Sequence, residues 1–481
     1  MAAGVKIAEL VNTDGSDVTP TGTVSTSGTT VTVTGGGDFE VYARVGGSII
    51  INGERRFIVS ITDIDHLEMN AALTTPASGD AYILLGQMVG RTVSSGTEPI
   101  LPASFRLPAD DPTNIDSLVP FKSFLYDAGL ALIVYAMEKD STRGQVIVDA
   151  ITTCISETEA ITSATGSLCF SASLWDPTQD PSGTVRSGAS AWVGYGLALF
   201  YEKTGYGPAL TNAQAIATYL AAQQVAGGGY DDELITGGHD DAVPIVWVSV
   251  EHNIDCYYFF KKMYEVTGTG SYATLRDEIK TALVTNLWDD TLGRFVQGAT
   301  SDDLDYAEPL DAYSWGGCFL LDMNEQDKAV RVANRMFTKF YVSGKNIPKQ
   351  NNVPDQYNQT YYSTLNYSGM RTYAETTDGE TGDSYVNPPE SIWQEGTQGA
   401  LLFLRRLKAL NLDSSIAFFD TYYNELEQSQ KGIYKITDDG SMLTWTESEI
   451  PLPYEFHVWR SLAPACWFYL NEKYPNAVFP Q

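Results

Sequence analysis

Five carboxylate side chains are spaced and placed for acid–base chemistry on a sugar. Glu251 and Asp255 are four residues apart, which puts both on one face of a helix among apolar neighbours. Carboxyl groups that share an apolar setting acquire different pKa values, so that one can donate a proton while another accepts one. Such a pair can cleave a glycosidic bond, and the catalytic candidates are Glu251, Asp255, Glu395, Asp232 and Asp311.

Aromatic rings recur beside these carboxylates. Flat rings stack on the faces of sugars, so a glycan cleft needs them next to its acid and base. The candidates for substrate binding are Trp192, Trp315, Trp393, Trp459, His252 and His457. Two simpler interpretations stay open: the helix dipole favours carboxylates near helix N-termini, and tryptophans on inner helix faces are often core residues.

The sequence predicts neither a metal nor a cofactor. His252 and His457 are far apart and lack the His-x-x-x-His spacing of a metal site. The acidic, glycine-rich loop at 227–241 leaves calcium binding as an alternative, although its spacing departs from that of an EF-hand. The sequence contains no glycine-rich phosphate loop, nucleophile elbow or zincin motif.

The net charge excludes two classes of partner. The 481 residues include 60 acidic and 30 basic side chains, a formal charge of −30. This field repels polyphosphates and anionic lipids, so we expect neither nucleic acid nor a membrane as a partner. At 43% hydrophobic and 12% aromatic residues, the chain has ample apolar surface to bury.

Signals of compartment are few. The first ten residues lack the basic and apolar regions of a secretory signal, and no segment has the roughly 18 to 20 apolar residues of a membrane span. Five cysteines at irregular intervals without a CxxC pair read as buried free thiols, typical of a chain made in a reducing cytoplasm.

Two regions of different composition must position the candidate residues. Residues 12–86 alternate Thr, Ser, Val and Ile as short strands do, and Asn52-Gly53 is the signature of a type I′ hairpin turn. We therefore predict a small all-β barrel or sandwich module over 1–86. Residues 87–119, rich in proline, read as a linker or a segment wrapped over the next domain.

Residues 120–481 show a repeating helical pattern. Apolar segments recur at steps of 67, 61, 61, 83 and 62 residues, marked by Leu130, Leu197, Tyr258, Phe319, Leu402 and Pro464. Repeated helix pairs bury their apolar faces against their neighbours, and six first helices close most simply into an (α/α)6 toroid. An open helical solenoid is the alternative. The longest step contains 345–389, which we interpret as a functional loop.

In such a toroid the first helix of each pair lines the inside, and we expect the last of these helices, without a partner after it, at about residues 457–474. Most of the candidate carboxylates and rings fall at or near the starts of these first helices, so we expect them to surround one cleft.

Ordered motifs within residues 120–480 resemble those of six-hairpin glycosidase-like bacterial proteins. They are Val250–Asp255 (VEHNID), Leu310–Trp315 (LDAYSW), Ile392–Ala400 (IWQEGTQGA) and Pro464–Asn476 (PACWFYLNEKYPN). The resemblance implies an (α/α)6 toroid and, if the protein hydrolyses glycans, inversion by a two-carboxylate mechanism. Toroids of this group include hydrolases, lyases and non-catalytic relatives, so activity has to be argued from the site.

The N-terminal segment resembles small β modules of bacteriophage tail and other virion proteins. The similar stretches are Gly22–Thr32 (GTVSTSGTTVT), Val45–Glu54 (VGGSIIINGE) and Ala77–Tyr82 (ASGDAY). The resemblance implies a tail-associated virion protein, made in the host cytoplasm and released by lysis. Its partners would be other virion proteins, bound through the N-terminal module, and further copies of itself in a homo-oligomer.

Three functions follow as hypotheses. The leading one is a phage virion protein whose toroid binds or hydrolyses a host-surface polysaccharide or oligosaccharide, preferably a neutral one. The second is a non-catalytic structural virion subunit, such as a decoration, fibre or connector protein. The third is a cytoplasmic bacterial glycosidase for imported oligosaccharides.

Overall fold

The computed structural model describes most of the chain. The described residues are 22–35, 39, 48–63, 65–69, 71–85, 101–106, 122–173, 177–178, 181–348, 362–374, 388–436, 442–447 and 456–476. Most of the predicted segment 87–119 and much of the loop 345–389 lie outside this description.

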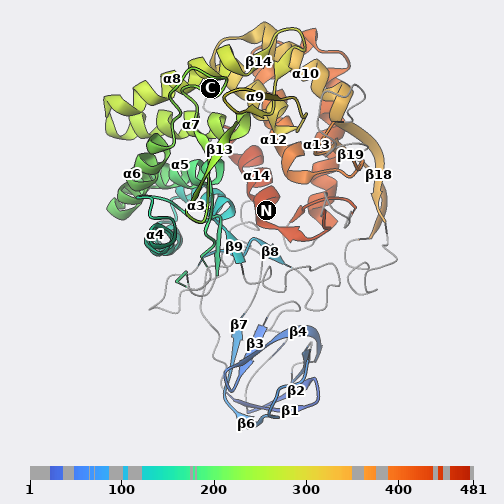
Figure 1. Cartoon of the computed structure of the whole chain (residues 1–481). Coiled ribbons are helices and arrows are strands. Elements are labelled where there is room, and N and C mark those ends of the chain that lie inside the picture. The colour runs from blue at the N-terminus through green and yellow to red at the C-terminus, as the bar shows by residue number, and fades with distance from the viewer. Residues whose placement is uncertain are drawn as a thin grey trace.

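The first strands form one curled sheet (Figure 1). Its order is β6-β1-β2-β5-β4-β3-β7, and the two edge strands are consecutive pieces of one stretch, separated only by Ala81, so the sheet wraps round toward itself. Asn52 and Gly53 have φ values of 54° and 78°, as the predicted hairpin turn requires. The strands are β1 (Thr23–Ser27), β2 (Thr30–Thr34), β3 (Ser48–Ile51), β4 (Glu54–Asp63), β5 (His66–Met69), β6 (Ser78–Asp80) and β7 (Tyr82–Leu85).

Helices make up most of the rest of the described chain, and all but the last are arranged in pairs. Six helices are inner ones: α3 (Leu125–Glu138), α5 (Ser187–Thr204), α7 (Val250–Thr267), α9 (Asp311–Asp322), α12 (Gln394–Ala409) and α14 (Leu462–Lys473). Each of the first five is followed by an outer helix: α4 (Ser141–Thr162), α6 (Gly207–Ala222), α8 (Gly270–Asn286), α10 (Gln326–Phe340) and α13 (Phe419–Ile436). All six register marks of the sequence pattern lie in the inner helices.

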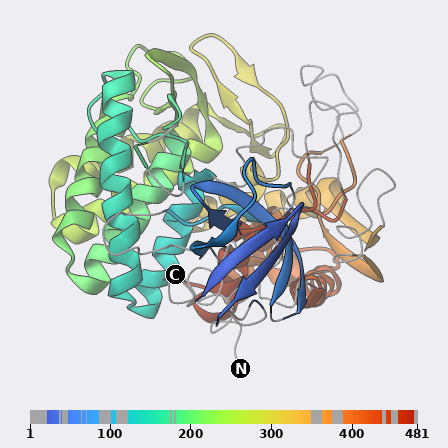
Figure 2. The ribbon, with the colours of Figure 1, turned by 90° about the horizontal axis from the view of Figure 1, so that it is seen from below.

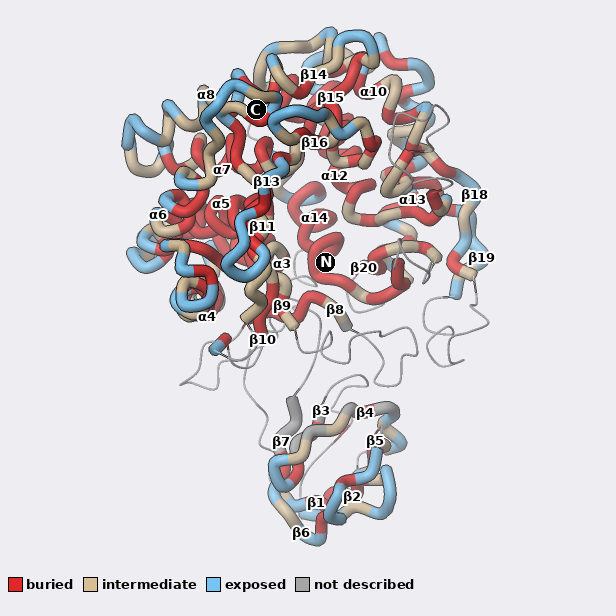
Figure 3. Tube along the Cα trace, in the orientation of Figure 1, coloured by how far each residue is buried: buried red, intermediate tan, exposed pale blue. Residues whose placement is uncertain are grey.

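The inner helices form a closed ring. Each contacts the next in chain order, and the last, α14, contacts the first, α3. This closure rules out the open solenoid and shows the predicted toroid. Figure 2 shows the helices of the first half, in teal and green, on one side of the ring and those of the second half, in orange and red, on the other. In Figure 3 the inner helices are almost entirely buried, whereas the outer helices expose one side.

Close packing of the ring depends on small residues. A Cβ atom on Gly196 of α5 would lie 2.7 Å from the carbonyl oxygen of Gly129 on α3. Only glycine allows the two inner helices to approach this closely, backbone against backbone.

Short strands lead directly into four of the inner helices. They are β9 (Lys122–Phe124) before α3, β11 (Thr184–Arg186) before α5, β13 (Val243–Ser249) before α7 and β21 (Arg460–Ser461) before α14. Each is paired with another strand, so the helix starts are fixed in space before the helices begin. Their partners and the remaining elements are β8 (Phe105–Arg106), β10 (Ser171–Ser173), β12 (Thr236–Asp240), β14 (Trp288–Asp289), β15 (Arg294–Phe295), β16 (Gly298–Ala299), β17 (Leu304–Asp305), β20 (Met442–Leu443) and a 3-10 turn at Asp413–Ser415.

The structure corrects two sequence-based boundaries. The last inner helix begins at Leu462, not near His457, because the preceding residues pair as β21 with β20 and β8. The segment read as a loop at 345–389 contains strand β19 (Ser363–Met370), which pairs with β18 (Tyr341–Ile347).

All five cysteines lie in the described residues and are buried free thiols, as predicted. Among the helices of the described chain, none is both long and apolar enough to cross a membrane.

Candidate functional site: a carboxylate-lined cavity at the inner helix starts

A cavity of about 480 Å³, here called the deep cavity, opens at the N-terminal ends of the inner helices. Five of the six inner helices contribute residues from their first two turns or their caps. The first turns of α3, α7, α9 and α12 each carry an acidic residue that lines it: Asp127, Glu251, Asp311 and Glu395. Asp255, one turn further along α7, is the fifth carboxyl group.

The deep cavity therefore brings together four of the five catalytic candidates. Asp232 is not among the residues that line it. The Asp232 carboxylate instead accepts a hydrogen bond of 2.9 Å from the backbone N–H of Gly227, and such bonds lower its pKa. Its part in the structure is to hold its own acidic loop.

Burial raises the pKa of every carboxyl group in the cavity. It raises the pKa of Glu251 to about 7 and that of Asp127 to about 7. For Asp255 and Asp311 the pKa lies well above its usual range, first because of burial and then because neighbouring carboxylates repel a second negative charge. These groups lie close together and interact, so they titrate as a cluster rather than one by one.

Glu395 is oriented by a chain of hydrogen bonds. The indole N–H of Trp467 donates to the Tyr126 hydroxyl over 2.9 Å, and that hydroxyl donates to Glu395 Oε1 over 2.5 Å. Burial raises the pKa of Glu395 to about 8, the Tyr126 hydrogen bond opposes the rise, and repulsion from Asp127 and Glu251 adds to it. At neutral pH Glu395 is therefore mainly protonated and held in one orientation.

The cavity carboxylates have no basic partner within the described residues, where no Lys or Arg forms an ion pair with any of the five. Arg186 lines the cavity, but its guanidinium is bound to Asp240 at 2.9 Å. Glu308 shows the contrast: it is about as buried as Asp127 and Asp255 but pairs with Arg335 at 2.7 Å, and its pKa is lowered. Unpaired carboxyl groups at such a density cost stability and point to function.

Tryptophan rings form the floor of the cavity. Trp192 and Trp315 line it, with ring centroids 6.2 Å apart. Trp467 packs behind both, at 5.2 and 5.1 Å. Trp393, the half-buried cap residue of α12, also lines the cavity. Three of the four tryptophans proposed to contact substrate are thus at the site, although Trp192 and Trp315 are at the same time core residues.

The structure places only one of the two candidate histidines at the deep cavity. His252 lines the deep cavity, and burial, together with the charge of Arg186, lowers its pKa to about 4. His457 and Trp459 stack on each other with centroids 3.9 Å apart, and neither lines the deep cavity. Both precede α14, which begins only at Leu462, so the expected inner-helix position was wrong for them.

Several residues that line the deep cavity were missed in the sequence, among them Tyr126, Asp127, Trp247 and Gly188. Tyr126 and Asp127 begin α3 just as Glu251 begins α7, so the rule applied to the later helices would have found them. Trp247 lies near the end of β13 and lines the cavity. Gly188 had no usable sequence signal: a Cβ there would lie 2.6 Å from His252 Cδ2 and 2.9 Å from Asp255 Oδ2, so its lack of a side chain leaves room for both groups.

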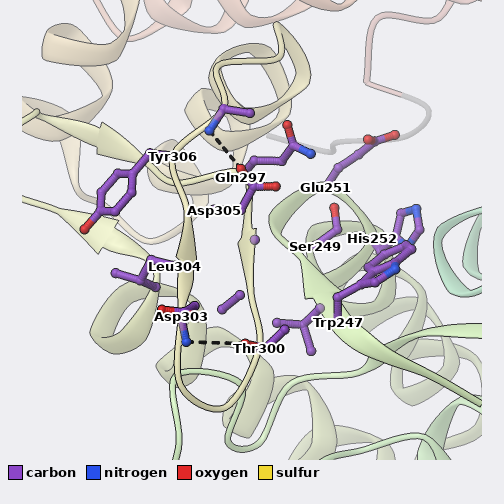
Figure 4. A pocket seen from close by; sticks show the side chains of 14 residues that line it. Trp247, Ser249, Glu251, His252, Gln297, Thr300, Asp303, Leu304, Asp305 and Tyr306 are labelled. Atoms are coloured by element: carbon purple, nitrogen blue, oxygen red, sulfur yellow. Dashed lines mark hydrogen bonds between the residues drawn. The ribbon is translucent and has the colours of Figure 1, made fainter. Parts of the chain in front are cut away.

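Two further cavities adjoin the deep one. The outer cleft, of about 700 Å³, has two walls (Figure 4). The end of β13 and the start of α7 form one wall, and the hairpin at residues 297–307 forms the other. A small cavity of about 130 Å³ is lined by Ser249, Gln297, Tyr373 and others. Glu251 lines all three cavities, and Asp311 lines the deep and the small one. Across the described residues, no three His, Cys, Asp or Glu side chains converge to hold a metal ion.

Comparisons with known proteins identify the fold. No family model matches the sequence, and no curated protein matches it. Among solved structures, the cellobiose 2-epimerase of Bacillus thermoamylovorans superposes with a TM-score of 0.53 at 9% identity, covering 78% of this chain and 93% of the epimerase. A D-mannose isomerase gives 0.50 at 12% identity, covering 77% and 91%. The cellobiose 2-epimerase of Spirochaeta thermophila gives 0.50 at 9% identity, covering 78% and 90%. At these identities the similarity is one of fold, the (α/α)6 toroid.

The raised pKa values predict how stability depends on pH. A carboxyl group whose pKa is higher in the folded than in the unfolded state stabilises the fold below pH 4.5 and loses that contribution as pH rises through the folded pKa. Unfolding of the wild type should therefore occur at a lower temperature at pH 8.5 than at pH 6. Glu395→Gln, which stays neutral, should be about 2 kcal/mol more stable than the wild type at pH 8.5, since each pKa unit corresponds to about 1.4 kcal/mol and cavity water reduces the full effect.

Thermal and urea unfolding of both proteins at the two pH values measures this. Glu390→Gln is the matched control, because Glu390 is paired with Lys345 at 2.7 Å and its pKa is lowered, so its charge does not change in this window. A Glu395→Gln variant that is less stable than the wild type at pH 8.5 would contradict the account.

Proposed function

We propose that the toroid binds and hydrolyses a neutral polysaccharide or oligosaccharide, with Glu395 as general acid and Glu251 as general base. The observation that carries this proposal is the set of buried carboxyl groups without basic partners beside tryptophan rings. Two polar atoms that are free to bind a ligand also support the proposal. Asp255 Oδ1 and His252 Nδ1 are buried and have no hydrogen-bond partner in the described structure. Sugar hydroxyls would supply those bonds.

The proposed reaction follows from the positions of the groups. Glu395, protonated and oriented by Tyr126, would donate its proton to the glycosidic oxygen as the C–O bond breaks. Glu251 would take a proton from a water molecule whose oxygen bonds to the anomeric carbon. The small cavity behind Glu251 and Asp311, about 130 Å³, has room for several waters at roughly 30 Å³ each and supports a water-using, inverting route.

Activity should be lost when either carboxyl group is neutralised. We expect Glu395→Gln and Glu251→Gln each to lower kcat by about 100-fold or more on a polysaccharide cleaved by the wild type, because general acid–base catalysis supplies about that factor. Release of new reducing ends, followed by chromatography, measures it, and Glu390→Gln should retain activity. Unchanged activity in both variants would overturn the assignment. A wild type that binds glycans without cleaving them would favour the non-catalytic structural subunit.

A second candidate function is isomerisation or epimerisation of a sugar. It is favoured by His252, a neutral imidazole whose Nδ1 has no partner in the described structure and whose ring lines the cavity. Such a base could take a proton from the carbon next to a sugar carbonyl. Return of the proton to the other face of that carbon would epimerise the sugar. Its return to the former carbonyl carbon, with the hydroxyl proton moving to the former carbonyl oxygen, would isomerise it. Proteins with this fold include a D-mannose isomerase and cellobiose 2-epimerases. Products of unchanged chain length with an altered reducing-end sugar would favour it over hydrolysis.

We also infer, from the sequence resemblance of the N-terminal module, that the protein belongs to a bacteriophage particle. Residues 1–86 would attach the toroid to other virion proteins, as a homo-oligomer, and thus carry it to the host surface. Mass spectrometry and reconstruction of purified particles test this, with the chain expected at a symmetric, tail-associated position. Finding it free in the bacterial cytoplasm and absent from particles would favour the cytoplasmic glycosidase instead.

A further inference from the structure

The outer cleft and the deep cavity share three residues: Trp247, Glu251 and His252. They stand where β13 ends and α7 begins, on one wall of the cleft, and Figure 4 shows Gln297 and Asp305 on the hairpin across from them. A ligand that fills the deep cavity can therefore continue past these residues into the outer cleft without leaving the protein surface.

Trp247 has the setting of a stacking platform. Its six-membered ring lies on Gly237 of β12, where a Cβ would come within 2.6 Å of it, and its centroid is 5.6 Å from that of His252. With this backing, the side chain is fixed, yet Trp247 remains 38% exposed. A rigid, exposed indole beside polar groups suits the face of a sugar ring.

The charged residues around the Trp247 platform in the outer cleft are all acidic. The charged residues that line the outer cleft are Glu251, Asp303 and Asp305, and no Lys or Arg lines it. Gln297 Oε1, which borders both the outer cleft and the small cavity, is a buried atom without a hydrogen-bond partner in the described structure. Acceptors without cations fit the hydroxyl groups of uncharged sugars and repel anionic ones.

The deep cavity is closed at its far end. Its lining residues on the inner helices come from the caps and first two turns, and below them Trp192, Trp315 and Trp467 pack together in the centre of the ring. Trp467 is almost fully buried. A chain of sugars cannot pass through this floor, so a glycan that fills the deep cavity would place one end against the tryptophans.

We propose that the outer cleft is a second sugar-binding subsite, built on Trp247, for the units that follow the chain end held in the deep cavity. The inference rests on the proposed carbohydrate function and specifies its substrate: a neutral glycan of several units, bound by one end.

Chain-length dependence tests this. A glycan array carrying neutral sugars as homologous series of one to six units is probed with wild type, Trp247→Ala, Trp247→Phe and Tyr264→Ala, and affinities for the best series are measured by calorimetry. Tyr264 is the control, an aromatic residue with 40% exposure at the other end of α7. In the wild type, affinity should rise at least tenfold between one and three units. Trp247→Ala should lose most of that rise, whereas Trp247→Phe and Tyr264→Ala should keep it.

Capping distinguishes entry by an end from binding along the chain. Tetramers that carry bulky groups at both ends should bind at least tenfold more weakly than tetramers capped at one end. The subsite is overturned if affinity is complete at one unit or if Trp247→Ala weakens all lengths equally, and end binding is overturned if doubly capped tetramers bind as well. If the wild type binds none of the series, the proposed carbohydrate function itself fails, and this inference with it.

Discussion

Closure of the inner ring by contact between α14 and α3 is the constraint on which the site depends. Because the ring is closed, the starts of its helices face one another, and the first-turn carboxylates of four helices meet in a single cavity. An open solenoid would spread the same residues along a surface. There water would hydrate each carboxylate, and its pKa would stay near the ordinary value.

Two opposing effects set the charge in the cavity. The N-terminal ends of the inner helices, none of them capped by a side chain in the described structure, direct positive partial charge toward the cavity and favour carboxylates there. Burial and mutual repulsion favour the protonated forms. The balance leaves Glu251 and Glu395 with pKa values of about 7 and 8, so that acid and base forms coexist near neutral pH. Burying these carboxyl groups together lowers the stability of the fold, and such a loss is typical of active sites.

Much of the fold was readable from the sequence because apolar periodicity reports burial directly. Leu130, Tyr258 and Leu402 marked inner helices, and Asn52-Gly53 marked a turn that needs positive φ. Site residues could be predicted from the sequence only where their position on an inner helix determined which residues they contact, as for Glu251 and Glu395. Trp459 and His457 were misplaced because pairing of β21 with β8, a strand some 350 residues earlier in the chain, overrode the local helical pattern. The roles of Gly188 and Trp247 depend on tertiary contacts, so the sequence alone could not indicate them.

The central claim is that the closed ring holds carboxyl groups protonated at neutral pH. It is tested most directly by carbon-13 NMR titration of the glutamate side chains in wild type and Glu395→Gln. We expect wild-type carboxyl resonances that titrate between about pH 7 and 8, one of them absent in the variant. Titration of every glutamate near its ordinary pKa of about 4.3 would contradict it.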